Sequence, residues 1–249
     1  MDEALRGKPS TAERLRAAVA NVTALREAAR ADPVLAQDRL LVRAWQADRL
    51  ARTYPDLLAS PRFGPAAAFF LSDLYGPKDF AARDEAVGRI IPTLTRMLPA
   101  AALETIALAV ELAGLSEALD VQVARLLRRG QPTAHAIEVT EPRYAAAYRS
   151  GSKADRERQI ELVGHIGSAL DRLARKPLIP AALRLMETPA RAAGLGALQE
   201  FLAHGFEAFR NMRGADEFLA TIASREALIN DRLFAGTPRP FDIEPVASP

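Results

Sequence analysis

Residues 10–25, STAERLRAAVANVTAL, contain the pattern that decides the fold class. The stretch opens with Ser10 followed by Glu13 three positions later, the spacing of a capping box, in which the two residues satisfy each other's backbone N–H at a helix start. Apolar residues then recur every three or four positions: Leu15, Val19, Val22 and Leu25. This period places them on one face of an α-helix. We therefore predict a helix that begins at Ser10 and buries this face.

The same helical period continues along most of the chain, which is rich in alanine, leucine, arginine and glutamate, all good helix formers. Proline and glycine mark the boundaries: Asp32-Pro33 is typical of a helix start and Gly76-Pro77 of a helix end. We predict an all-α fold, a compact bundle of about nine helices. We expect a flexible N-terminus over residues 1–9, a single helical domain over 10–235, and a Pro-rich extended or disordered tail over 236–249.

Two parts of the pattern are less regular. Pro99 precedes the most hydrophobic segment, residues 100–112, and we expect a further helix after it that ends near Gly130. Between residues 131 and 148, Pro132 and Pro142 interrupt the helical period, and AIEVT at 136–140 is strand-like.

Composition narrows the class of protein. Of 249 residues, 49% are hydrophobic and 26% charged, as in globular proteins that bury a core. The formal net charge is +2 and arginines are interleaved with acids, so we expect no nucleic-acid partner. The lack of cysteine excludes disulfides and thiolate metal ligands. No run approaches the roughly 20 apolar residues of a membrane span. The N-terminus lacks a signal-peptide pattern, and we expect a cytoplasmic protein.

The least generic segment is FFLSDLYGPKDFAARD, residues 69–84. Core burial explains its phenylalanines and leucines, and Gly76-Pro77 explains the end of a helix. The remaining polar residues allow a second interpretation, a polar pocket beneath the junction of two helices, because a buried acid or tyrosine hydroxyl needs a partner. The residues that we assign to this pocket are Asp73, Tyr75, Asp79, Arg83 and Asp84.

A second cluster adds possible partners for these acids. Trp45, Arg49 and Arg52 lie near one face of the helix that follows Pro33. An amphipathic helix with extended arginines accounts for them. Alternatively, Arg49 or Arg52 pairs with Asp73 or Asp84 across a helix interface and so belongs to the same ligand or interface site.

Two of the three histidines follow a glutamate by four residues, which are the pairs Glu161/His165 and Glu200/His204. On helices, each pair would present a carboxylate and an imidazole on one face, and two facing pairs could hold zinc or iron. Glu138, Glu207 and His135 could supplement them. The Glu-x-x-His spacing of di-iron bundles does not occur, and partly exposed histidines on amphipathic helices are the simpler explanation.

The segments 69–84 and 205–226, with the patterns FFLxDLYGPxDFxxRD and GFxAFxxMxGA, together resemble a family of helical bacterial proteins of unknown activity. The resemblance would cover most of the chain. It implies a helical fold and a bacterial setting, and it transfers no catalytic residue.

Three hypotheses about function remain open, and the sequence does not decide whether the protein is an enzyme. The first is a non-catalytic ligand-binding or protein-interaction module, with self-association or a protein partner at the junction after Phe69. The second is a metalloenzyme or haem-handling protein, of haem-oxygenase-like shape, that uses Glu161, His165, Glu200 and His204. The third is a lipid or isoprenoid carrier with a small apolar ligand between its helices. Nucleotide-binding and serine-hydrolase motifs are absent.

Overall fold

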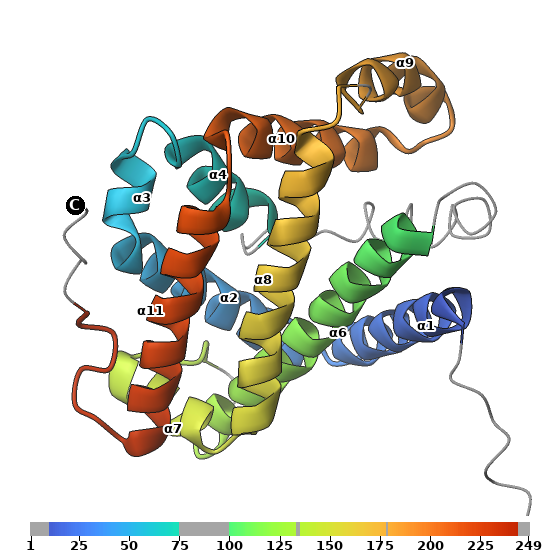
Figure 1. The fold of residues 1–249 in the computed structure, drawn as a ribbon. Helices are drawn as coiled ribbons and strands as arrows, with labels where there is room; N and C mark the ends of the chain where they lie inside the picture. The colour runs from blue at the N-terminus through green and yellow to red at the C-terminus, as the bar shows by residue number, and fades with distance from the viewer. Residues whose placement is uncertain (1–9, 75–99, 133–134, 178, 244–249) are drawn as a thin grey trace, which may run out of the picture.

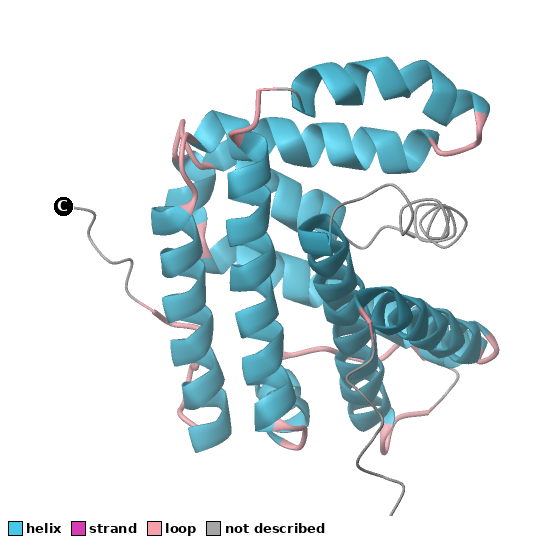
Figure 2. Cartoon of the chain, turned by 45° about the vertical axis from the view of Figure 1, so that its right-hand side comes forward, coloured by secondary structure: helices cyan, strands magenta, loops and turns pink. Residues whose placement is uncertain are grey.

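The computed structural model describes residues 10–74, 100–132, 135–177 and 179–243. Within these ranges the chain forms ten α-helices and one π-helical turn, with no strand (Figures 1 and 2). The predicted all-α fold is confirmed. The segment 136–140, which is strand-like in sequence, is an irregular connection whose Ile137 is buried in the core.

The elements in chain order are α1 (Thr11–Arg30), α2 (Pro33–Thr53), α3 (Pro55–Ala59), α4 (Gly64–Phe69), the π-helical turn η1 (Phe70–Leu74), α6 (Ala100–Arg128), α7 (Glu141–Arg149), α8 (Lys153–Ala174), α9 (Ile179–Ala192), α10 (Gly196–Met212) and α11 (Asp216–Ala235). Helices α8 and α11 lie side by side, α1 packs along α6, and α9 folds back on α10 at one end (Figure 1).

The first two helices begin where the sequence predicts. At α1 the Ser10 amide donates to the Glu13 carboxylate at 2.8 Å, and the Glu13 amide donates to the Ser10 hydroxyl at 3.3 Å. At α2 the Asp32 carboxylate accepts from two backbone amides, those of Val34 and Leu35, at 3.1 and 3.0 Å. These bonds satisfy donors that have no partner inside a helix. The capping box and the Asp-Pro start are both confirmed.

The prediction of two helices between residues 100 and 130 is wrong. α6 is a single helix of 29 residues, and Gly114 lies in its interior. A β-carbon at Gly114 would lie 3.1 Å from Cγ2 of Val22, so the glycine lets α1 approach α6 closely. Packing therefore explains this glycine, which in isolation would weaken a helix.

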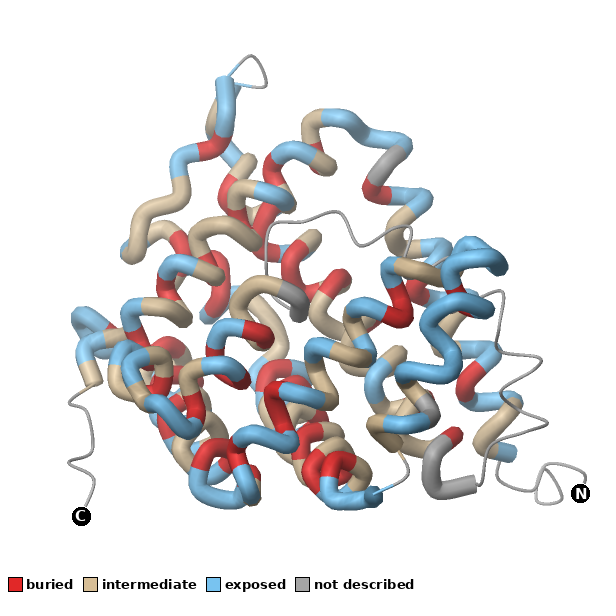
Figure 3. Tube along the Cα trace, turned by 90° about the horizontal axis from the view of Figure 1, so that it is seen from above, coloured by how far each residue is buried: buried red, intermediate tan, exposed pale blue. Residues whose placement is uncertain are grey.

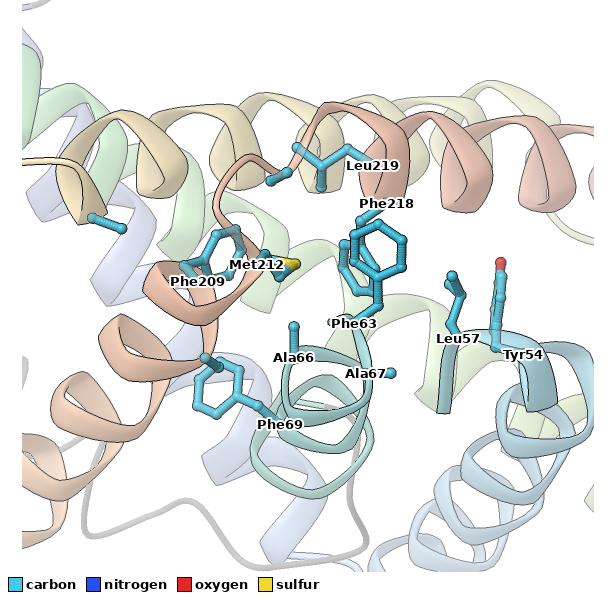
Figure 4. Close-up of a cluster of buried hydrophobic side chains, with 13 residues drawn as sticks. Tyr54, Leu57, Phe63, Ala66, Ala67, Phe69, Phe209, Met212, Phe218 and Leu219 are labelled. Atoms are coloured by element: carbon cyan, nitrogen blue, oxygen red, sulfur yellow. The ribbon is translucent and has the colours of Figure 1, made fainter. Parts of the chain in front are cut away.

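Buried residues lie along each helix (Figure 3), and their apolar side chains form three clusters. The first cluster joins α3, α4, α10 and the start of α11 through aromatic rings, among them Phe63, Phe69, Phe209 and Phe218 (Figure 4). The second joins α2, α6, α7 and the end of α11 around Val42, Val123, Tyr144 and Ile229. The third is small and lies between α1 and α6.

Part of the C-terminal segment packs on the second cluster. The ring of Phe241 lies edge-on to Trp45, with centroids 5.7 Å apart, and the Arg49 guanidinium lies 5.5 Å from the centroid of Phe241. The Arg232 guanidinium donates to the Asp242 carbonyl at 2.7 Å. The predicted domain limits stay predictions, but the core contacts extend past residue 235 to Ile243.

Two glycines in helices are expected to respond oppositely to alanine. A β-carbon at Gly205 of α10 would lie 2.8 Å from Cζ of Phe69, a buried ring that cannot bend away. A β-carbon at Gly164 of α8 would have no atom within 4 Å. We expect Gly205→Ala to lower the free energy of unfolding by about 1–3 kcal/mol through overpacking. We expect Gly164→Ala to raise it by about 0.5–1 kcal/mol through helix propensity.

Urea unfolding followed by circular dichroism measures both changes. Equal effects of the two substitutions would contradict the close approach of α4 and α10 at Gly205.

Candidate functional site

A cavity of about 90 Å³ lies where the middle parts of α2, α8 and α11 face each other. The π-helical turn η1 and helix α7 supply further wall residues, including Leu71 and Tyr148. Each of the three long helices contributes residues three or four positions apart, because that spacing keeps side chains on one face. The cavity is thus built from segments that are far apart in the sequence and meet only in the fold.

The wall of the cavity is divided into an apolar and a polar part. The apolar wall includes Leu50 of α2, Leu71 of η1, Val163 of α8, and Phe218 and Ile222 of α11. The polar wall includes Gln46, Arg49, Tyr144, Arg156, Gln159 and Glu226. The transition from the apolar to the polar wall occurs along a single face of α11. On this face Phe218, Ile222 and Glu226 follow one another at four-residue intervals.

On the polar wall, Arg49 and Glu226 form a two-pronged ion pair. Nη1 and Nη2 of Arg49 donate to the two Glu226 oxygens at 2.6 and 3.1 Å, and the Tyr54 hydroxyl donates to the same carboxylate at 2.7 Å. Burial first, and then the negative Glu226, raise the pKa of Tyr54, so its hydroxyl keeps the proton that it donates. Burial lowers the pKa of Arg49, but the charge and the hydrogen bonds of the Glu226 carboxylate together have a larger effect, so the pKa of Arg49 is raised overall. Arg49, Glu226 and the neutral Tyr54 hydroxyl together therefore carry no net charge.

Arg156 has a different environment. It is 5% exposed, and its Nη1 donates to Oε1 of Gln159 at 3.1 Å. Its guanidinium carbon lies 4.3 Å from the centroid of the Tyr148 ring, a cation–π arrangement. Among the residues that the structure describes, no carboxylate lies within ion-pair distance of Arg156. A buried guanidinium whose direct partners are neutral therefore lines the cavity.

Tyr144 is the second unusual group of the polar wall. It is fully buried, and its ring stacks on Trp45 with centroids 4.2 Å apart. Its hydroxyl makes no hydrogen bond with any described residue. Burial raises the pKa of Tyr144, so the hydroxyl is a protonated donor. Leaving such a donor without an acceptor costs about 1–3 kcal/mol.

The residues assigned to a polar pocket after Phe69 fall largely beyond the described ranges. Tyr75, Asp79, Arg83 and Asp84 lie outside the described residues, and of Asp73 only the backbone, in η1, is described. Their role stays a prediction. The beginning of the same segment does reach the cavity, because Phe70 and Leu71 form part of its wall.

The second predicted cluster separates in the structure. Arg49 lies at the cavity and pairs with Glu226, an acid that the sequence analysis did not assign to a site. Trp45 belongs to the second core cluster, beside the cavity-lining Tyr144. Arg52 is exposed at the surface of α2.

The alternative metal site is not assembled. His165 and His204 are both exposed, Glu161 pairs with Arg158 at 2.8 Å, and Glu200 lies 3.8 Å from Arg191. Within the described part of the chain, no three His, Asp or Glu side chains gather closely enough to hold a metal ion. Equal Glu-to-His spacing on α8 and α10 does not make the two pairs face each other.

Sequence reasoning missed four residues of the polar wall, which are Tyr144, Arg156, Gln159 and Glu226. Glu226 carries a recognisable signal, since it interrupts an apolar face of α11 between Ile222 and Ile229. Arg156 and Gln159 stand in a polar helix start, where exposure is the ordinary expectation. Only the packing of α8 against α6 and α11 shows that they are buried.

In the described residues no helix has the length and apolar character to cross a membrane. Comparison with curated proteins and with solved structures found no match. Residues 25–240 match the family described as "Domain of unknown function (DUF8198)". The match includes both segments, 69–84 and 205–226, whose patterns resemble a helical family. The chain therefore belongs to the DUF8198 family.

Proposed function

We propose that the protein binds a small amphipathic molecule in the cavity between α2, α8 and α11. The observation that carries this proposal is the divided wall, apolar on one side and lined with buried polar and charged groups on the other. Ligand sites in proteins are typically of this kind, with an apolar lining and a few polar groups that orient the ligand. The proposal develops the ligand-binding hypothesis of the sequence analysis.

The size of the cavity sets the size of the ligand. A single water-sized group occupies about 10–15 Å³ on the same measure, so 90 Å³ holds roughly six to nine non-hydrogen atoms. This range corresponds to a short-chain or single-ring compound. We therefore propose a small ligand rather than haem or a long isoprenoid.

Self-association stays a separate prediction. Leu185 on α9 is 78% exposed, and Met186 beside it is also exposed. Exposed apolar residues of this kind are found at protein contacts and also singly on ordinary surfaces. The cavity is the stronger basis for a function, because it brings buried polar groups of three helices together.

Filling the cavity from α8 tests the proposal. The β-carbon of a residue at position 164 meets no atom within 4 Å, so Gly164→Leu places its side chain in open space at the cavity wall. We expect the wild-type protein to bind hexan-1-ol at one saturable site in isothermal titration calorimetry. We expect Gly164→Leu to weaken this binding at least about tenfold, since apolar contacts of the ligand are lost.

His165→Leu is the matched control, because it adds a leucine at the next, exposed position of the same helix and should leave binding unchanged. Ala223→Leu fills the cavity from α11 and should act like Gly164→Leu. Circular dichroism establishes that each variant is folded. The proposal fails if hexan-1-ol, hexanoate and hexanamide all give no binding, or if folded Gly164→Leu binds as the wild type does.

A further inference from the structure

We infer that the natural ligand of the cavity carries one carboxylate, and that Arg156 holds it. The inference rests on the proposed function and adds the chemical class of the ligand. Three observations carry it: the ion pairs of the polar wall, the contacts of Arg156, and the hydroxyl of Tyr144.

Among the described residues, the ion pairs of the polar wall leave one arginine without a carboxylate in direct contact. Arg49 is neutralised by Glu226, which it contacts through both guanidinium nitrogens. Asp120, just behind the cavity wall, accepts from the Gln46 amide at 2.8 Å and lies 3.9 Å from Arg43. Asp120 also attracts Arg156, but the arginine within ion-pair distance of Asp120 is Arg43. Among the described residues, Arg156 therefore has no carboxylate in direct contact, and a ligand carboxylate would supply one.

The contacts of Arg156 identify it as this arginine. Its direct partners are the neutral Gln159 amide oxygen and the face of Tyr148. The planar guanidinium carries five donors in a fixed fork, and a single bond to Gln159 leaves donors free for a carboxylate. A buried charge without an ionic partner is unfavourable, so a carboxylate that pairs with it would be held strongly.

Tyr144 adds a second donor near the same wall. Its hydroxyl has no acceptor among the described residues, although the side chain is fully buried. A ligand oxygen at the polar end of the cavity could accept this proton as well. A neutral acceptor would satisfy both donors, but only an anion also compensates the charge of Arg156.

A carboxylate fits this site better than a phosphate or an amine. A phosphate monoester carries close to two negative charges at neutral pH, which exceeds the single positive charge of Arg156. An ammonium group would add a second uncompensated cation beside Arg156. The apolar wall formed by Leu50, Val163 and Ile222 then accommodates a short hydrocarbon body.

Hexanoate and hexanamide provide a matched pair of probes, because they have the same number of non-hydrogen atoms and differ in charge. Near neutral pH the carboxylic acid is ionised. We expect the wild-type protein to bind hexanoate about tenfold to a hundredfold more tightly than hexanamide in calorimetric titrations, the range of a charge-assisted hydrogen bond. Hexylamine should bind more weakly than both.

Arg156→Gln should remove the preference for hexanoate while leaving hexanamide binding within about twofold. Arg156→Lys keeps the charge without the planar fork and should retain part of the preference. If Arg156→Gln does not fold, the wild-type comparison and Arg156→Lys still decide the question.

The outcomes separate the two proposals. Equal binding of hexanoate and hexanamide overturns the carboxylate inference and leaves the proposed function standing. A preference for hexanoate that persists in folded Arg156→Gln overturns the assignment of Arg156. Absence of binding by hexan-1-ol, hexanoate and hexanamide overturns the proposed function and the inference with it.

Discussion

Replacement of Glu226 by alanine is expected to lower the free energy of unfolding by about 3–5 kcal/mol, one of the two largest effects of any single substitution considered for this chain. The side chain of Arg49 is only 8% exposed, and Glu226 is its ionic partner. Without this carboxylate, a buried guanidinium loses its counter-charge and the buried Tyr54 hydroxyl loses its acceptor. Both groups would retain the cost of desolvation without the bonds that offset it.

Urea denaturation of Glu226→Ala measures this loss, and Glu217→Ala is the control on the same helix. Glu217 pairs with Arg62 at 2.9 Å, but both side chains are about half exposed. An exposed pair contributes about 0–1 kcal/mol. Similar losses for Glu226→Ala and Glu217→Ala would contradict the burial of the Arg49–Glu226 pair and with it the structure of the polar wall.

A comparable loss is expected for Phe209→Ala in the first core cluster. The ring is 1% exposed and belongs to the cluster that contains residues of α4 and α11 (Figure 4). Its centroid lies 6.2 Å from that of Phe70 in η1. Truncation of a buried phenylalanine to alanine costs about 3–5 kcal/mol, because transfer free energy is lost and a cavity remains. The neighbouring π-helical turn would lose one of its packing partners, so the walls of the ligand cavity should loosen too.

Leu202→Ala is the appropriate comparison for Phe209→Ala. Leu202 lies on the same helix, α10, but is 45% exposed, so we expect a change within about 0.5–1 kcal/mol. Thermal or urea unfolding of the two variants distinguishes the buried from the exposed face of α10. A small effect of Phe209→Ala would mean that α10 does not pack on η1 as described.

The sequence predicts the elements of this protein well because local chemistry sets them. Ser10 and Glu13 form the predicted capping box, and Asp32-Pro33 starts α2 as expected. The same local reasoning fails between residues 100 and 130, where it predicts two helices and the structure has a continuous α6 that contains Gly114. The reason lies in tertiary packing, because the absence of a side chain at Gly114 allows the close approach of Val22 on α1.

The cavity was harder to predict, because its walls come from three distant parts of the chain. Arg49, Arg156 and Glu226 belong to different helices, and no motif spacing joins them. Arg49 was predicted as a site residue, but with Asp73 or Asp84 as its partner, whereas the structure pairs it with Glu226. The Glu-to-His spacing on α8 and α10 suggested a metal site that the helix orientations do not form.

Whether a ligand occupies this cavity is tested most directly by NMR on protein with labelled methyl groups, titrated with hexanoate. We predict intermolecular nuclear Overhauser effects from the hexanoate chain to the methyl groups of Leu50, Val163 and Ile222, which line the cavity. Effects confined to the exposed Leu185 and Leu202, or none at all, would contradict the account.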